Sequence, residues 1–158
     1  MWSKSPHNDP TSMMVDELRS KPEETFNAII EYNGPRYHID PRDIDMPMGI
    51  LLSKIADLVP HLFIPHMTEG FWGSRYMYIG AAAECQASIY KDIFVQLLTD
   101  RSTYIKTLIL RLIIEWPHLQ TEEMIPQLEK LRQMKSFQKD NMDKELLNKA
   151  FDVVLSNT

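Results

Sequence analysis

The chain has 158 residues, of which 44% are apolar and 25% are charged, and its 17 basic and 22 acidic side chains give a formal net charge of -5. These values are typical of a globular protein and exclude wholesale disorder, and the length fits one domain. The acidic balance disfavours nucleic acid as the main partner, because neutralising phosphates requires a basic face.

The expected location is intracellular, either cytoplasmic or nuclear. A single cysteine, Cys85, cannot form an internal disulfide, which favours a reducing compartment. The first residues contain no apolar run of the kind that a secretory signal needs. The most apolar segment, residues 104–114, includes Lys106 and Arg111 and is far shorter than the ~20 residues that cross a bilayer. We therefore expect no membrane span.

The N-terminal third of the chain shows a loose start followed by helical patterns. Residues 1–10 contain two prolines and several polar side chains, so we expect a flexible terminus before a single helical domain over residues 11–158. Ser20-Lys21-Pro22-Glu23 has the spacing of a capping box. It predicts a helix that ends at Asn33-Gly34-Pro35, where glycine and proline stop the pattern.

The next segments alternate between regular and irregular patterns. RYHI at residues 36–39 alternates polar and apolar side chains, which predicts a short extended piece. Residues 48–59 predict an amphipathic helix that ends at Pro60. Residues 60–73 contain two prolines and two glycines among large apolar side chains. We interpret this segment as an aromatic loop that packs on the domain.

The second half of the chain predicts the core of the fold. A central pair of helices is expected over residues 75–98 and 100–115, and the second is apolar almost all round, as in a buried helix. Two further helices follow, one after Thr121 and one over about 142–155. The fold class is therefore all-α, with five to seven helices arranged as a compact bundle or as a short HEAT-like stack.

The segment YIGAAAECQASIY, residues 78–90, raises the question of a catalytic cysteine. Gly80, Ala83 and Ala87 are spaced by three and four residues, which favours a close helix–helix contact. Cys85 is expected within the helix, away from its first turn and from any histidine, so nothing lowers its pKa. We interpret the segment as a packing seam and not as a nucleophilic site.

No motif points to catalysis, a metal or a cofactor. His61 and His66 are five residues apart across two prolines, which matches no compact ligand pattern. Acidic pairs such as Glu122 and Glu123 are explained as residues favoured at helix starts. We expect that the protein is not an enzyme and that it uses no catalytic residue, metal or cofactor, although a small enzyme stays open as a minor alternative.

One segment resembles a known family. Met48, Leu52, Ile55, the pair Ala56-Asp57, and Val59 have the spacing of the BH3 segment of the Bcl-2 family. Downstream, Trp72-Gly73 followed by Arg75 is similar to part of that family's Asn-Trp-Gly-Arg motif. The resemblance implies, as an alternative function, a Bcl-2-like regulator with a BH3-like helix at 48–59 and a groove that accepts an amphipathic helix.

The function that the sequence favours is protein–protein interaction. An adaptor or scaffold would bind a partner protein or peptide segment through a helical groove or through the aromatic loop. Aromatic and methionine side chains concentrate at binding surfaces, and loops often carry them. Homo-oligomerisation stays open. The expected partner-binding residues are Phe63, Met67, Phe71, Trp72 and Trp116, with Trp2 as a further surface anchor.

Overall fold

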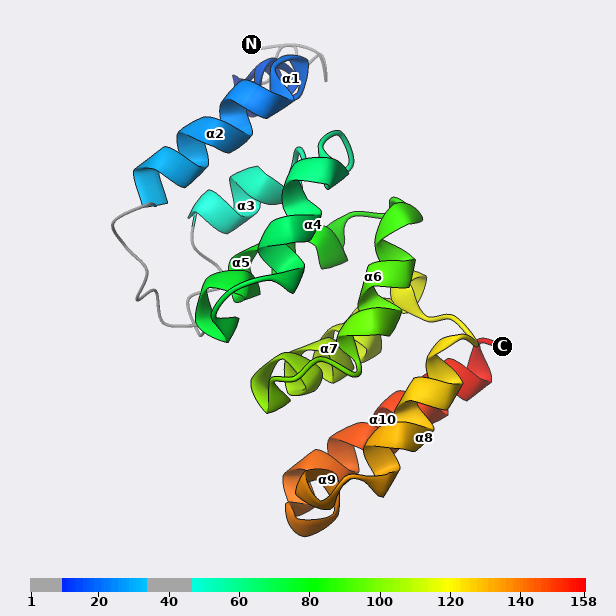
Figure 1. Ribbon diagram of the computed structural model, residues 1–158. Helices are drawn as coiled ribbons and strands as arrows, with labels where there is room; N and C mark the ends of the chain where they lie inside the picture. Colours follow the sequence, from blue (N-terminus) through cyan, green and yellow to red (C-terminus); the bar gives the residue numbers. More distant parts are fainter. Residues whose placement is uncertain (1–9, 34–46) are drawn as a thin grey trace.

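The computed structural model describes residues 10–33 and 47–158, and it is helical throughout this part (Figure 1). The described residues form ten α-helices and one short 3₁₀ helix, with no strand among them. The all-α class is confirmed, but the expected five to seven helices are too few. The expected loose terminus at 1–10, Trp2 and the RYHI segment at 36–39 lie outside the described residues, apart from Pro10, which begins the first helix. The helices are α1 Pro10–Ser20, α2 Pro22–Asn33, α3 Pro47–Ser53, α4 Pro60–Thr68, α5 Trp72–Glu84, α6 Ile89–Leu97, α7 Thr103–Glu115, η1 Pro117–Leu119, α8 Met124–Gln133, α9 Lys135–Lys139 and α10 Asn141–Ser156.

The helices pack on helices that lie one to three positions away along the chain, and the most extensive contacts are those of α7 with α10 and of α3 with α5. α1 packs on α2, α2 on α3, and α3 and α4 pack on α5. α5 and α6 then pack on α7, which in turn carries α10, with α8 and α9 beside it. Figure 1 shows the resulting layers in order from the blue α1 to the red α10. None of the described helices has the length and hydropathy needed to cross a membrane.

The helix predicted over 75–98 is in fact two helices, α5 and α6. Cys85 leaves the helical conformation with φ −77° and ψ 130°, so it ends α5 and does not lie within a helix. The ring of His118 places Nε2 2.7 Å from the Ala83 carbonyl oxygen, which gives a partner to a carbonyl that a helix end leaves open. The Tyr90 hydroxyl, just past the break, donates to the Ala56 carbonyl. The break therefore coincides with hydrogen bonds to residues that are distant in the sequence. Residues 85–88 themselves contain no glycine or proline.

The loop predicted over 60–73 is also wrong over most of its length, because residues 60–68 form α4. Pro60 occupies the first turn, where its missing N–H costs nothing. Pro65 is accepted inside the helix, which buries Phe63 and Met67 four residues apart on one face. Only the turn around Gly70 remains irregular, and its φ of +91° is a conformation that favours glycine.

The helix predicted over 48–59 is shorter than expected. α3 ends at Ser53, and residues 54–58 continue as tight turns in which Lys54 and Ile55 donate to carbonyls three residues back. Its apolar side chains still face inward: Leu52, Ile55 and Val59 are buried. Gly80 and Ala83 of the predicted seam are buried on α5, the helix that contacts α3, α4 and α7, while Ala87 lies in the break.

Candidate functional site

Four aromatic side chains meet on the surface where the α4–α5 turn approaches the start of α7. Trp72, the first residue of α5, stacks on Tyr104 of α7 with ring centroids 4.3 Å apart and planes 22° from parallel. The ring centroid of Trp72 lies 5.2 Å from that of Phe71 and 5.6 Å from that of Tyr76. We call this cluster of Phe71, Trp72, Tyr76 and Tyr104 the aromatic corner.

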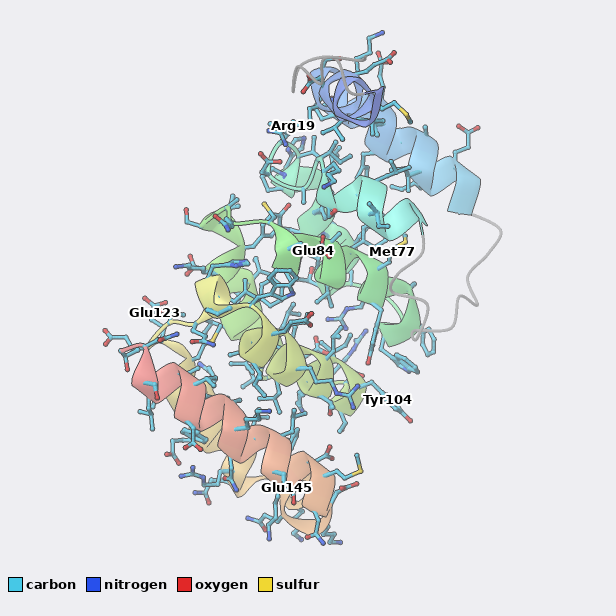
Figure 2. The ribbon with its side chains drawn as sticks, turned by 180° about the vertical axis from the view of Figure 1, so that it is seen from behind. Arg19, Met77, Glu84, Tyr104, Glu123 and Glu145 are labelled. Carbon is cyan, nitrogen blue, oxygen red and sulfur yellow. The ribbon has the colours of Figure 1, made fainter. Side chains whose placement is uncertain are left out.

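The aromatic corner is open to solvent at its outer rings. Phe71 is 63% exposed and Tyr104 is 58% exposed, while Trp72 and Tyr76 are half-buried. Figure 2 shows Tyr104 pointing away from the beginning of α7 at the edge of the molecule. The Tyr76 hydroxyl donates to the Tyr104 backbone carbonyl at 3.3 Å, and burial raises the pKa of Tyr76 above its usual range. Tyr76 therefore stays a neutral donor that ties α5 to α7.

A buried ion pair joins the start of α5 to the α6–α7 turn. Arg75 is only 1% exposed, and its guanidinium donates to both carboxylate oxygens of Asp100, at 2.7 and 3.2 Å. Its Nε donates to the Met67 carbonyl at 2.6 Å, so one side chain holds the end of α4, the start of α5 and the α6–α7 turn together. Bidentate arginine–carboxylate pairs of this kind define orientation as well as distance.

Asp100 is held as a carboxylate by its surroundings. Burial alone raises the pKa of Asp100. Two hydrogen bonds lower it, one from Arg75 and one from the Ser102 amide at 2.9 Å, and the positive charge of Arg75 lowers it further, so that the effect of burial is outweighed. The net result is a pKa below the ordinary value of an aspartate. The ion pair therefore persists at neutral pH and below it.

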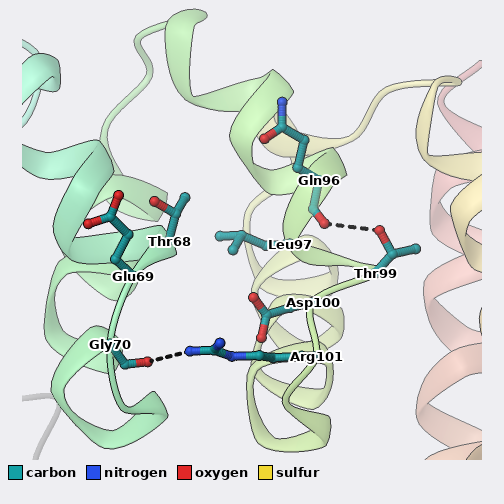
Figure 3. A pocket seen from close by; sticks show the side chains of 8 residues that line it. All are labelled: Thr68, Glu69, Gly70, Gln96, Leu97, Thr99, Asp100 and Arg101. Carbon is teal, nitrogen blue, oxygen red and sulfur yellow. Dashed lines mark hydrogen bonds between the residues drawn. The ribbon is translucent and has the colours of Figure 1, made fainter.

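A hollow of about 560 Å³ lies between the ends of α4 and α6 (Figure 3). One wall is the end of α4 with the following turn, and the other is the end of α6 with the α6–α7 turn. Arg101 reaches across and donates to the Gly70 carbonyl at 3.4 Å. Gly70 directly precedes Phe71 in the sequence, but none of the four rings of the aromatic corner lines the hollow. The lining residues are Thr68, Glu69, Gly70, Gln96, Leu97, Thr99, Asp100 and Arg101.

The residues predicted to bind a partner fall into three places. Phe71 and Trp72 lie together in the aromatic corner. Phe63 and Met67 have no exposed area and belong to the core, so they do not form part of this surface. Trp116 ends α7, whose length separates it from Tyr104 by about 18 Å at 1.5 Å per residue.

Sequence reasoning missed Tyr76, Tyr104 and the Arg75–Asp100 pair. A signal for Tyr104 exists: Tyr104, Thr107 and Arg111 form a stripe on one face of an otherwise apolar helix, and Tyr104 and Arg111 are exposed there. The ion pair gives no such signal, because its partners are 25 residues apart and meet only through the fold.

The side chains considered for catalysis or metal binding, Cys85 and His66, pack against neighbouring groups of the fold. Cys85 is buried, its sulfur accepts from the Ala87 amide at 3.4 Å, and burial raises the pKa of its thiol. His66 stacks on Tyr78 at 4.7 Å, and burial lowers its pKa. In the part of the chain that the structure describes, no three His, Cys, Asp or Glu side chains are placed to hold a metal ion.

A second hollow lies beside α1, α2 and α3 and has a volume of about 510 Å³. Its floor is apolar, with Leu18, Ile29 and Leu51, and charged side chains such as Glu17 and Lys21 line it as well. Asp57, the aspartate of the BH3-like pattern, pairs with Arg19 at 2.8 Å at the edge of α1, and this hydrogen bond lowers the pKa of Asp57.

Comparisons with protein-family models, with curated proteins and with solved structures find no match for this chain. The two surface sites, the aromatic corner and the hollow beside α1, α2 and α3, are therefore the basis for a proposed function.

Proposed function

We propose that the protein is a protein–protein interaction module of the adaptor or scaffold type that docks a partner segment on the aromatic corner. The observation that supports this is the exposure of Phe71 and Tyr104 in a cluster whose rings are in contact, with Trp72 stacked on Tyr104. Aromatic side chains in a fixed arrangement lose little entropy on binding, which is why they dominate binding hot spots. The buried Arg75–Asp100 ion pair holds the start of α5, which carries Trp72, to the turn that precedes α7, which carries Tyr104.

The arrangement of the helices is consistent with such a role. The contacts of each helix are with helices one to three positions away along the chain, which is consistent with a short HEAT-like stack, an architecture that exposes extended surfaces to partner segments. The single cysteine, buried and unpaired, supports an intracellular location for the module.

Site-specific photocrosslinking in the native cell tests the proposal. A benzoylphenylalanine placed at Phe71 is expected to capture a defined partner, and the Trp72→Ala change in the same chain is expected to abolish the capture. The matched control is the same probe at Met142, which is 75% exposed on α10. Equal capture from both positions, or capture that survives Trp72→Ala, contradicts a partner site at the aromatic corner.

A fold control accompanies this experiment. Phe71→Ala is expected to change the unfolding midpoint little, since most of its ring is exposed. Leu108→Ala, which empties a buried position on α7, is expected to cost ~2–5 kcal/mol. A midpoint for Phe71→Ala as low as that of Leu108→Ala identifies Phe71 as a core residue and removes it from the proposed site.

The second hollow favours the alternative function, a Bcl-2-like regulator that accepts an amphipathic helix. It is an apolar groove with charged residues around it, next to the segment with the BH3-like spacing. A peptide that forms an amphipathic helix is then expected to bind the protein and to lose its binding on Leu18→Glu. Binding that is unaffected by Leu18→Glu excludes this groove.

A further inference from the structure

We infer that the break between α5 and α6 is a hinge through which two copies of the chain exchange α6–α10 and form a domain-swapped dimer. In this dimer, residues 85–88 become helical and join α5 and α6 into one continuous helix over residues 72–97. Each copy then packs its α6–α10 half on the α1–α5 half of the other copy. Domain swapping of this kind forms dimers readily, because the exchanged element keeps its native contacts.

The fold divides into two halves at this break, as exchange requires. In the first half, α1 packs on α2, α2 on α3, and α3 and α4 pack on α5. In the second half, α6 and α10 pack on α7, while α8 and α9 pack on α10. The two halves meet mainly where α5 contacts α7 and where α4 contacts α6. The chain passes from one half to the other only at residues 85–88, so no other covalent connection keeps the halves together.

The hinge residues are close to a helical conformation already. Ser88 has φ −61° and ψ −24°, which are helical values, whereas Cys85 is extended with ψ 130°. Residues 85–88 are Cys-Gln-Ala-Ser, and none of these residue types opposes a helix as strongly as glycine or proline does. A change of the backbone at Cys85 and the two residues after it is therefore what separates the break from a continuous helix.

Straightening the hinge gives partners to backbone groups that lack them in the monomer. Within the described part of the chain, the amides of Gln86 and Ser88 donate to no protein group. In a continuous helix each of them donates to the carbonyl four residues back. These bonds offset the loss of the contact between His118 and the Ala83 carbonyl, which is engaged within the longer helix.

The surface that accepts the exchanged half is the one that this half occupies in the monomer. Arg75 and Trp72 belong to α5, and their partners Asp100 and Tyr104 follow the hinge, so both contacts link the two halves. In the dimer they form between copies with the same partners. The aromatic corner is therefore present twice, each time with Trp72 from one copy and Tyr104 from the other. The proposed function holds with or without the exchange.

Refolding of the full chain at high concentration, followed by size-exclusion chromatography with light scattering, measures the dimer. Wild type is expected to give a dimer beside the monomer. Gln86→Pro is expected to lower the dimer association constant at least ~100-fold, because proline at 86 is incompatible with the continuous helix. Gln86→Ala keeps the hinge able to form a helix and is the matched control, with an unchanged dimer. No wild-type dimer, or a dimer that Gln86→Pro leaves unchanged, overturns the hinge.

The Gln86→Pro monomer is expected to keep the wild-type unfolding midpoint. Gln86 is exposed, its amide donates to no protein group in the described residues, and the extended Cys85 before it has the conformation that a following proline requires. The lost dimer is thereby separated from a damaged fold. A midpoint that falls with the dimer contradicts the assignment of residues 85–88 as a hinge that proline locks.

His118→Phe tests the bond that holds the break. The change removes the hydrogen bond to the Ala83 carbonyl and keeps a ring beside Trp116. Because the monomer makes this bond and the swapped dimer does not, the dimer association constant is expected to rise roughly three- to tenfold. A constant that is unchanged or lower contradicts a hinge held closed by His118.

Charge reversal at the buried pair distinguishes exchange of halves from contact between intact monomers. Arg75→Asp gives one variant two aspartates at the pair, and Asp100→Arg gives the other variant two arginines, so each monomer buries two like charges. In a swapped dimer of one copy of each variant, opposite charges meet at both pairs, one of them in the wild-type arrangement. The co-refolded mixture is therefore expected to form this dimer and to unfold at a higher midpoint than either variant alone. A mixture no more stable than its components overturns the exchange.

Discussion

Replacing Arg75 by methionine is expected to destabilise the protein by about 3–5 kcal/mol, because the change breaks a buried ion pair and leaves its partner uncompensated. The guanidinium donates three hydrogen bonds, two to Asp100 and one to the Met67 carbonyl. Hydrogen bonds to charged groups contribute ~1.5–3 kcal/mol each, so three of them sum to roughly 4.5–9 kcal/mol, which overlaps only the upper end of this range. In the variant, the Asp100 carboxylate regains some hydration, because its side chain is 11% exposed. The expected loss of about 3–5 kcal/mol is therefore smaller than most of the hydrogen-bond sum.

Urea unfolding followed by circular dichroism measures this loss as a change in the free energy of unfolding. Arg111→Met serves as the control, since Arg111 is exposed on α7 and its removal is expected to change the free energy by less than ~0.5 kcal/mol. If Arg75→Met loses no more than the control, the bridge contributes nothing to stability, and the argument that it fixes the two turns fails.

Three further predictions concern individual positions. Ala83→Leu is expected to overpack the buried face of α5 and to lower the free energy of unfolding by ~1–3 kcal/mol in the same assay; an unchanged value contradicts a tight seam. Because burial raises the pKa of the Cys85 thiol, alkylation of the folded protein is expected to be slow at neutral pH and to accelerate as the pH rises and the thiolate forms. Rapid alkylation at neutral pH contradicts the buried environment. Gly73→Ala places a Cβ 2.9 Å from the Phe71 ring, so the ring must move. The variant is therefore expected to bind a partner more weakly. Its free energy of unfolding is expected to be unchanged or up to ~0.5–1 kcal/mol higher, because alanine favours a helix more than glycine does. Binding that is unaffected by Gly73→Ala excludes the observed position of the Phe71 ring from recognition.

The helical class was predictable from the sequence, but the number of helices was not. Apolar side chains recur at helical spacing across residues 75–115, and this pattern alone identifies the class. The break at Cys85 contains no glycine or proline, and it is held by His118, which lies 35 residues from its acceptor. Contacts of that separation leave no mark on local propensity, so a single long helix was the natural expectation.

The candidate site was predictable only in part, and for a related reason. Phe71 and Trp72 attract attention as neighbouring aromatic residues, but treating residues 60–73 as a loop gave Phe63 and Met67 equal weight. In α4 those two side chains share one buried face, which the proline-based loop interpretation concealed. Tyr104 joins the corner through the packing of α7 on α5, where the Tyr76 hydroxyl donates to a carbonyl 28 residues away in the sequence.

A double replacement distinguishes stability from orientation as the role of this pair. Apolar residues of similar volume in place of a buried ion pair are often neutral or stabilising, because the desolvation of both charges is avoided. Arg75→Leu combined with Asp100→Leu is therefore expected to be clearly more stable than Arg75→Met, although the Ser102 amide and the Met67 carbonyl lose partners at ~1 kcal/mol or more each.

Partner binding is expected to be weaker in this double variant than in the wild type, because a leucine pair does not set the angle between α5 and α7, which carry Trp72 and Tyr104. Urea unfolding and peptide titration on the same preparation measure the two effects. Wild-type binding in the stable double variant contradicts a positioning role for the bridge. A double variant as unstable as Arg75→Met shows instead that the pair's hydrogen bonds, and not the isolated charge, hold the two turns.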